Sequence, residues 1–482
     1  MGEPKLLRLT AGSAVLGLLL AGGAAAAAGP WDGGQRTAER ALAAAPHATG
    51  GAHHGGARPG PGGDGSGSDR AGRPDGPGRQ APAPAPSAPG VLAALGEAPA
   101  PPARSLAGTL TPLLAAPGLG PVRTAAVVDA RTGRRLYGSG ADSPMTPAST
   151  IKIATAAAAL TALGPAHRLR TTVVAAPDAR RVTLVGGGDP TLDRPRLRAL
   201  AADTARALRG RGVETIQLSY DTSLYSGPAR HPIGVNDNIA PVSALMTDEG
   251  RLDSSTSGPA PRSADPAADT ARAFGALLAG HGIATRGAPA PGRAPEQATG
   301  IARTYSQPLS ALVERTLTHS DNDLAEALAR HTAIATGRPA SFTGAAEAIR
   351  TRLGELGVPL TGARIADASG LDRRDRISAA TLTALLARAA APDRPALRPV
   401  LTGLPVGGFS GTLKDRYAAT SPGAGLVRAK TGTLSGVNTL AGTVVTADGR
   451  LLAFAFLAGR TPSPYDAQSA LDALAAALAP RA

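Results

Sequence analysis

The chain has 482 residues, a net charge of +14, no cysteine and an aromatic content of only 2%. The absence of cysteine excludes disulfides, thiol catalysis and cysteine-bound metals, so packing alone must hold the fold together. Residues 1–103 contribute eight Lys or Arg against seven Asp or Glu, a net +1, so the basic surface belongs to the remainder of the chain.

Residues 1–28 are typical of an export signal. Lys5 and Arg8 precede the apolar run "LTAGSAVLGLLLAGGAAAAAG", which ends in the small residues that signal peptidases prefer. We expect cleavage; the alternative is an uncleaved membrane anchor formed by residues 10–28, because the run approaches the length that spans a bilayer. The predicted location is extracellular, at the cell wall, where a basic surface favours anionic wall polymers or a membrane face. We expect no nucleic-acid partner, because export and the scarcity of aromatic residues disfavour one.

Residues 29–103 are rich in Pro, Gly and Ala, as in "HHGGARPGPGGDGSGSDRAGRPDGPGRQAPAPAPSAPG". Such a segment has too few large apolar groups to offset the entropy of ordering it. The composition predicts a disordered tether.

Residues 104–164 are predicted to form the first part of a catalytic domain. "VRTAAVVDARTGRRLYGSG" alternates apolar and polar residues on either side of "DARTG", which predicts a hairpin. The turn-rich "DSPMTPAST" leads into an alanine-rich run from Ile151 to Leu163, so Ser149 is expected in the first turn of a helix or at its cap.

Residues 165–300 are predicted to form an inserted region of mixed elements. The patterns predict a hairpin at 169–186, helices at 193–210 and 266–280, a strand over "ETIQLSYD", and loops at 254–265 and 286–299.

Residues 301–482 are predicted to complete the catalytic domain. A helical pattern through "LSALVERTLTHSDNDLAEALARHTAIAT" is interrupted at "HSDN", three strands follow over "LVRAKTGTLSGVNTLAGTVVTADGRLLAFAFLAGR", and a helix over 467–478 closes the chain. Helical sequence in mid-chain and an antiparallel meander near the end predict an α+β fold.

The spacing of Ser149 and Lys152 suits nucleophilic catalysis. Residues at i and i+3 share one helix face, so the amine can reach the hydroxyl. A desolvated lysine can take the proton of a serine, whereas arginine cannot release its own proton. Alone, the pair also suits a capping serine beside a solvated lysine. The chain uses lysine only four times, at Lys5, Lys152, Lys414 and Lys430, and arginine could not replace Lys152 as a base.

Two further motifs each occur once: "SDN" at Ser320 to Asn322, and "KTGT" at Lys430 to Thr433. Alone, the first suits a helix cap and the second an edge strand with a protective lysine. Together with Ser149 and Lys152, in this order, they match the Ser-x-x-Lys, Ser-Asp-Asn and Lys-Thr-Gly set of penicillin-interacting serine enzymes.

The chain resembles the D-alanyl-D-alanine carboxypeptidase/endopeptidase family, the class C low-molecular-mass penicillin-binding proteins. Ser149 and Ser320 are 171 positions apart, and the family carries a long insertion at this point. Other stretches that fit the family are "LVGGGDPTL", "DTSLYSGP", "APVSALMTDEGRLD", "DASGLDRRDRIS" and "GTLKDRY". The resemblance implies a β-lactamase/DD-peptidase-like domain, with an antiparallel sheet flanked by helices and a large inserted region.

The resemblance also implies the catalytic roles. Ser149 would attack the carbonyl between two D-alanines, Lys152 would accept its proton, and Ser320 would relay a proton to the departing nitrogen. The substrates would be peptidoglycan stem peptides that end in D-Ala-D-Ala, and β-lactams would acylate Ser149 as inhibitors.

Binding roles follow from the same resemblance. Asn322 would hold the substrate amide, Lys430 would keep the site positive, and Thr431 and Thr433, on either side of Gly432, would bind the terminal carboxylate. The backbone N–H groups of Ser149 and Thr433 would form the oxyanion hole. Asp237 in "VNDNIAPVSA" is the candidate for an aspartate of the insertion that faces the cleft, and a simple turn residue is the alternative.

Two other functions stay open. A β-lactamase would share the acylation step, but it needs a base for fast deacylation, and no Glu-x-x-x-Asn element lies between the two serine motifs. A wall-binding or penicillin-sensing module without turnover would suit the basic surface and the tether.

The sequence contains no motif of other hydrolase classes. Gly-x-Ser-x-Gly and His-Glu-x-x-His are both absent, and "GGGDP" lacks the residues of a phosphate-binding loop. We therefore expect neither a metal nor a cofactor.

Overall fold

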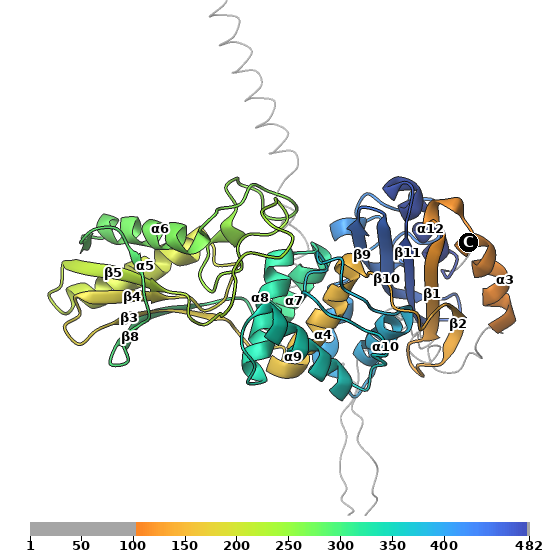
Figure 1. Cartoon of the computed structure of the whole chain (residues 1–482), viewed down its shortest axis with the longest axis horizontal. Coiled ribbons are helices and arrows are strands. Elements are labelled where there is room, and N and C mark those ends of the chain that lie inside the picture. The colour runs from red at the N-terminus through yellow and green to blue at the C-terminus, as the bar shows by residue number, and fades with distance from the viewer. Residues whose placement is uncertain (1–102, 480–482) are drawn as a thin grey trace, which may run out of the picture. The chain divides into compact units, whose positions relative to one another are not determined.

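The computed structural model describes residues 103–479, and of these the side chains from Leu106 onward (Figure 1). The predicted export signal and almost all of the predicted tether lie outside the described residues. None of the helices in the described part combines the length and the hydropathy that a bilayer-spanning segment needs.

A five-stranded antiparallel sheet forms one part of the structure. Its strand order is β2–β1–β11–β10–β9, so that strands from both ends of the sequence lie side by side. The strands are β1 (Val122–Asp129), β2 (Arg135–Ser139), β9 (Arg428–Leu434), β10 (Val437–Val445) and β11 (Leu451–Gly459).

Alternate residues of β11 pack into two different hydrophobic clusters. Phe454 and Phe456 pack with α3 (Ala103–Leu114) and α12 (Pro464–Ala476). Ala453 and Ala455 pack on the opposite face, where α10 (Ala379–Ala390) lies against β11. Because both faces of the sheet are covered, the central strand β11 is apolar throughout instead of alternating with polar residues.

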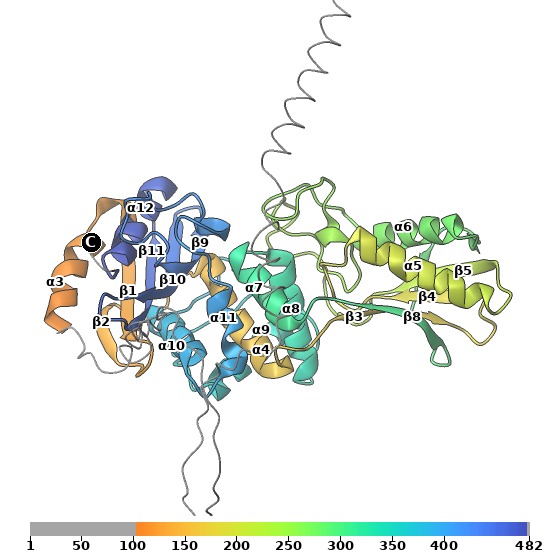
Figure 2. The ribbon, with the colours of Figure 1, turned by 180° about the vertical axis from the view of Figure 1, so that it is seen from behind.

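The helices on the second face form a cluster beside the sheet (Figure 2). Its core consists almost entirely of aliphatic side chains, many of them alanines. The helices are α4 (Lys152–Leu163), α7 (Leu309–Thr318), α8 (Asn322–Ala335), α9 (Phe342–Glu355), α10 (Ala379–Ala390) and α11 (Pro399–Thr402). Short 3₁₀ turns are η2 (Pro117–Leu119), η3 (Ala148–Ile151), η4 (Asp248–Gly250), η5 (Pro395–Leu397) and η6 (Gly411–Leu413).

A second, six-stranded sheet forms between α4 and α7, with its own hydrophobic core beneath two helices, α5 (Arg194–Arg209) and α6 (Pro266–Gly280). β3 pairs antiparallel with β4 and β8, and the strands beyond β4 run parallel. The strands are β3 (Arg170–Ala175), β4 (Arg181–Val185), β5 (Thr215–Asp221), β6 (Ala284–Thr285), β7 (Ala290–Pro291) and β8 (Thr299–Tyr305).

The predicted boundary at residue 300 falls inside β8. This strand pairs along its length with β3, so the second sheet continues to Tyr305. No strand pattern is evident here in the sequence, because β8 lies at the sheet edge with no fully buried residue and begins with Thr299 and Gly300. The division into catalytic and inserted domains stays a prediction.

Candidate active site

Ser149 and Lys152 lie where the 3₁₀ turn η3 runs into α4. The Lys152 amine is 3.0 Å from the Ser149 hydroxyl oxygen. Ser149 is half-buried and borders a cleft, whereas Lys152 is completely buried at the first position of its helix. The i, i+3 spacing therefore places a buried amine directly behind an accessible hydroxyl.

Lys152 has two further hydrogen-bond partners. Its Nζ donates to Asn322 Oδ1 at 2.7 Å and to the carbonyl oxygen of Ser369 at 2.6 Å. A charged ammonium has three donors, so Ser149 would be its third acceptor. A neutral amine instead has two N–H groups and one lone pair. In that form Lys152 donates to Asn322 and Ser369, and its lone pair faces the Ser149 hydroxyl.

Burial lowers the pKa of Lys152 to about 8, against the opposing effect of the surrounding carboxylates, of which Asp367 is the strongest. Burial disfavours the charged form because the interior solvates an ammonium poorly. An amine with a pKa near 8 is neutral in a useful fraction of molecules at neutral pH, as a general base requires.

The Ser320–Asn322 motif forms the turn between α7 and α8. Ser320 lines the cleft and has a φ of +58°, a conformation that costs a residue other than glycine about 1–3 kcal/mol. Asp321 caps α8 by accepting from the Leu324 N–H at 2.9 Å, and it pairs with Arg315 at 3.0 Å. These contacts hold the strained turn in place.

Asn322 is oriented from two sides. Its Oδ1 accepts from Lys152, and its Nδ2 donates to the carbonyl oxygen of Asn238 at 2.9 Å. Since the carbonyl of Asn238 can only accept, the amide nitrogen must face it, and the amide oxygen therefore faces the amine. Asn238 belongs to the loop after β5 and also lines the cleft.

The Lys430–Thr433 motif lies on β9, the edge strand of the five-stranded sheet. Lys430 is completely buried and donates to the carbonyl oxygen of Thr431 at 2.8 Å. Burial, together with the nearby charge of Lys152, lowers the pKa of Lys430 well below its ordinary value. A bound carboxylate would reverse part of this shift, because an opposite charge favours the ammonium form.

Gly432 allows β9 to approach the nucleophile. A Cβ at this position would lie 2.1 Å from Thr439 Oγ1 and 2.7 Å from the carbonyl oxygen of Pro147, two residues before Ser149. Thr431 is half-buried, and its hydroxyl donates to that of Thr412 at 2.8 Å; Thr433 is exposed, and both threonines line the cleft.

The motifs meet at a cleft of about 410 Å³. Part of its lining comes from the loop after η4, which forms one wall, and part from residues near β9 and α12. The lining residues are Ser149, Asn238, Arg251, Ser257, Gly258, Pro259, Arg262, His319, Ser320, Asp321, Asn322, Leu371, Thr412, Arg416, Thr431, Thr433 and Gln468. Three segments that are far apart in the sequence therefore form one site. Of the predicted residues that do not line the cleft, Lys152 is buried directly behind Ser149, Lys430 and Gly432 lie within β9, and Asp237 lies apart.

Asp237 is placed differently. Its side chain is exposed, its carbonyl oxygen accepts from the Ala260 N–H at 2.9 Å, and the neighbouring Asn238 borders the cleft instead. A substrate-binding role for Asp237 stays a prediction.

Sequence reasoning did not identify Asn238 or the Ser369 carbonyl as parts of the site. Both contribute a backbone oxygen, which leaves no residue-type signature. The available signals were that "DASGLDRRDRIS", which contains Ser369, fits the family, and that Asn238 is the neighbour of the candidate Asp237 in "VNDNIAPVSA".

Two groups of described residues bring metal-ligand atoms within 4.8 Å of one another: His231, Glu326 and Asp367, and Glu249, Asp321 and Asp323. In the first group the carboxylates accept hydrogen bonds from backbone N–H groups. In the second they pair with arginines, among them Arg315 and Asp321 at 3.0 Å. The potential metal-ligand atoms thus already have hydrogen-bond or ion-pair partners within the protein. We therefore propose no metal at either group.

Comparison with known proteins agrees with this geometry. The model of the D-Ala-D-Ala carboxypeptidase 3 (S13) family matches residues 106–261 and 254–478. Carboxypeptidase DacB of Mycolicibacterium smegmatis is 41% identical over 83% of this chain and 89% of its own length. Carboxypeptidase Rv3627c of Mycobacterium tuberculosis is 38% identical over 83% of this chain and 90% of its own length.

A solved structure is similar in fold. The crystal structure of penicillin binding protein 4 (dacB) from Haemophilus influenzae has a TM-score of 0.64 at 22% identity, and the match covers 77% of this chain and 98% of that one. The predicted α+β fold, an antiparallel sheet flanked by helices, is confirmed. The chain belongs to the D-Ala-D-Ala carboxypeptidase 3 (S13) family, as its motifs predicted.

Proposed function

We propose that this protein is a serine-type D-Ala-D-Ala carboxypeptidase that acts on peptidoglycan stem peptides through an acyl-enzyme at Ser149. The observation that carries the proposal is the buried Lys152 amine, 3.0 Å from the Ser149 hydroxyl and 2.7 Å from Asn322. Membership of the family supports the substrate class.

Acylation begins when the neutral Lys152 accepts the proton of Ser149. The Ser149 oxygen bonds to the carbonyl carbon of the penultimate D-alanine, and the backbone N–H groups of Ser149 and Thr433 stabilise the developing oxyanion. Ser320 relays a proton to the departing nitrogen, the C–N bond breaks, and D-alanine leaves. Loss of one oxyanion donor costs about 3–4 kcal/mol in comparable sites, so β9 must be held rigidly.

Deacylation completes the cycle. Water adds to the ester carbonyl, the bond to Ser149 breaks, and the hydroxyl regains its proton while the shortened peptide leaves as a carboxylate. Thr431 and Thr433 bind the terminal carboxylate of the substrate, and the buried Lys430 behind them keeps the site positive. Three arginines also border the cleft, and each is paired with a carboxylate: Arg251 with Glu249, Arg262 with Asp323 and Arg416 with Asp472.

Intact-mass analysis after penicillin treatment, followed by peptide mapping, tests the nucleophile. We expect one adduct on the peptide that contains Ser149, and none in Ser149→Ala. Release of D-alanine from diacetyl-Lys-D-Ala-D-Ala tests turnover. An adduct without D-alanine release would favour a penicillin-sensing module, and rapid nitrocefin hydrolysis would favour a β-lactamase.

The place of action follows from the substrate. We propose that the protein is exported to the cell wall, which the predicted signal in residues 1–28 supports, and that the basic surface binds anionic wall polymers or a membrane face. Fractionation of cells, with N-terminal sequencing of the wall-associated protein, would identify the compartment and distinguish a cleaved signal from an anchor.

A further inference from the structure

The third partner of Lys152 belongs to none of the three motifs. The carbonyl of Ser369 that accepts from Lys152 lies in a buried turn, residues 367–372, between α9 and α10. The N–H of the same peptide unit, that of Gly370, donates to Asp367 Oδ1 at 2.7 Å. In a trans peptide the C=O and N–H point in opposite directions. Holding the Gly370 N–H on Asp367 therefore turns the Ser369 carbonyl toward the amine.

The turn packs directly against the nucleophile. Gly370 has a φ of +83°, and a Cβ there would lie 2.1 Å from the carbonyl oxygen of Ala148, the residue before Ser149. Thr155 of α4 donates to the carbonyl oxygen of Ala368 at 2.8 Å. A displacement of the turn would therefore reach both Ser149 and Lys152.

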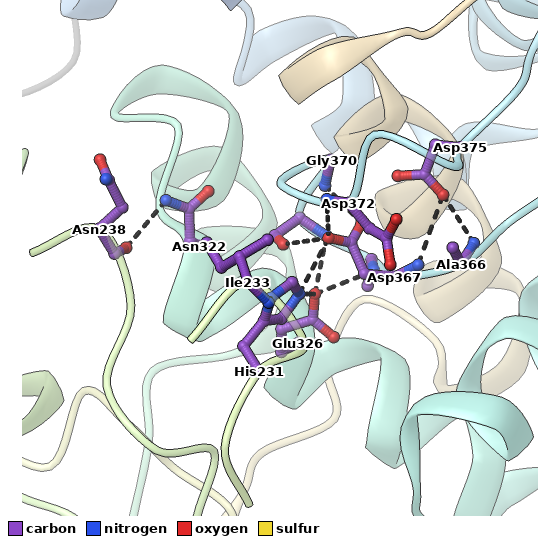
Figure 3. Close-up of polar contacts among 12 residues, drawn as sticks. His231, Ile233, Asn238, Asn322, Glu326, Ala366, Asp367, Gly370, Asp372 and Asp375 are labelled. Carbon is purple, nitrogen blue, oxygen red and sulfur yellow. Dashed lines mark hydrogen bonds and ion pairs between the residues drawn. The ribbon is translucent and has the colours of Figure 1, made fainter. Parts of the chain in front are cut away.

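Two buried carboxylates hold this turn (Figure 3). Glu326 Oε1 accepts from the N–H groups of Ala368 and Ser369, both at 2.9 Å. Asp367 Oδ2 accepts from the Asp372 N–H at 2.7 Å and from the Ser369 hydroxyl at 3.1 Å. The backbone of the turn is thus fixed from inside the protein and does not depend on solvent.

His231 completes the arrangement from a different part of the chain. It lies in the loop between β5 and η4, is 2% exposed, and its Nε2 is 3.0 Å from Asp367 Oδ2. Its Nδ1 accepts from the Ile233 N–H at 3.3 Å, which selects the tautomer that carries the proton on Nε2. His231 therefore donates to Asp367.

The loop that carries His231 contacts the amine by a second route. Asn238, seven residues later, accepts from Asn322, and Asn322 in turn accepts from Lys152. The same loop therefore contacts both supports of Lys152: Asn238 holds Asn322, and His231 holds Asp367 behind the Ser369 carbonyl.

We propose that His231 and Asp367 are a pair of positioning residues, which aim the Ser369 carbonyl at Lys152 and so hold the amine against Ser149. Neither side chain lines the cleft, so the pair acts through Lys152 and not on the substrate. The inference rests on the proposed function, since it concerns the base of that reaction.

The first test compares His231→Ala with His231→Gln. The glutamine amide can still donate to Asp367, whereas alanine cannot. We expect the rate constant of acylation by penicillin to fall about 10- to 100-fold in His231→Ala, the usual effect of losing a hydrogen bond to a charged group. The penicillin concentration at half-maximal rate should not change, and His231→Gln should recover most of the rate.

The matched control is His331→Gln. His331 is a buried histidine of α8 that packs beside Tyr225, with the two ring centroids 6.0 Å apart. We expect this variant to acylate at the wild-type rate. Equal loss of rate in His231→Gln, His231→Ala and His331→Gln would mean general destabilisation and would overturn the proposal, as would a wild-type rate in His231→Ala.

A second variant, Asp367→Asn, separates charge from geometry. The acidic groups around Lys152 are Asp367, Asp321, Glu326 and Asp375, whose negative charge favours protonation of the amine, whereas the charge of Lys430 opposes it. Burial and the Asp367 charge raise the pKa of Asp375 to about 10, so Asp367 carries the charge of this pair at neutral pH. Removal of the Asp367 charge should lower the pKa of Lys152, so the midpoint of the acylation rate against pH should move to lower pH. If the pH midpoint of the acylation rate stayed unchanged in Asp367→Asn, the proposal that Asp367 acts through Lys152 would be contradicted.

The two proposals can fail separately. If wild-type protein is not acylated at Ser149, the proposed function is wrong. If wild-type protein is acylated and His231→Ala keeps its rate, only the positioning role is wrong.

Discussion

Arg262 and Asp323 form a buried ion pair, with Nη1 2.8 Å from Oδ2 and side chains only 4% and 2% exposed. Arg262 belongs to the loop that forms one wall of the cleft, and Asp323 to the first turn of α8, next to Asn322. Asp323 also accepts from the Ala240 N–H at 2.9 Å. The pair thus ties the cleft wall to the helix that carries the second motif.

Arg262→Ala should destabilise the protein by about 3–5 kcal/mol, because it leaves a buried carboxylate without its partner. Burial already raises the pKa of Asp323 to about 7, and Arg262 opposes that rise. Urea unfolding at pH 7 measures the loss. As a control, Arg206→Ala removes an exposed pair with Asp203 and should cost about 1 kcal/mol or less. Equal losses in the two variants would contradict this account.

Lys152→Arg should abolish acylation, because a guanidinium does not release its proton at accessible pH. The loss should be about 100- to 10,000-fold, the range of general acid–base catalysis. Labelling with a fluorescent penicillin measures it. Lys414 is exposed, so Lys414→Arg is the matched control and should label like wild type. Labelling of Lys152→Arg at the wild-type rate would refute the role of Lys152 as base.

The acylation rate should depend on pH through Lys152. Burial lowers the pKa of this amine to about 8, and only the neutral form accepts the Ser149 proton. The rate should therefore rise with pH, reach half its maximum near pH 8, and level off above it. Stopped-flow acylation between pH 6 and pH 10 measures the profile. A rate that falls across this range would require a protonated Lys152 in the step.

Gly432→Ala should displace β9 from the nucleophile. The new methyl group would lie 2.1 Å from Thr439 Oγ1 and 2.7 Å from the Pro147 carbonyl oxygen, so the strand must move. Such overpacking costs about 1–3 kcal/mol of stability. We expect slower acylation because the Thr433 N–H moves with the strand.

The control for this substitution is Gly354→Ala. Gly354 lies in α9 with open space at its Cβ position, and alanine is the better helix former, so stability should be unchanged or rise slightly. Penicillin acylation and thermal unfolding of both variants distinguish a local clash at β9 from a general effect of replacing glycine.

Local sequence was sufficient to predict those parts of the site whose residues are neighbours along the chain. Ser149 and Lys152 are three residues apart, so helical geometry alone places the amine behind the hydroxyl. The interruption at "HSDN" likewise corresponds to the turn between α7 and α8, because Asp321 is a favourable helix cap. The edge strand β8 was missed, because neither of its faces is fully buried.

By itself, the sequence determined the family, the α+β class and the three motifs, because each of these is written in residue types at short, regular spacings. Only the tertiary structure decided that Lys152 donates to the Ser369 carbonyl, that His231 stands behind Asp367, and that Asn238 and not Asp237 borders the cleft. The physical reason is that these contacts join backbone groups and side chains from distant segments. Their geometry depends on how two sheets and a helix cluster pack, and no local pattern of residues records it.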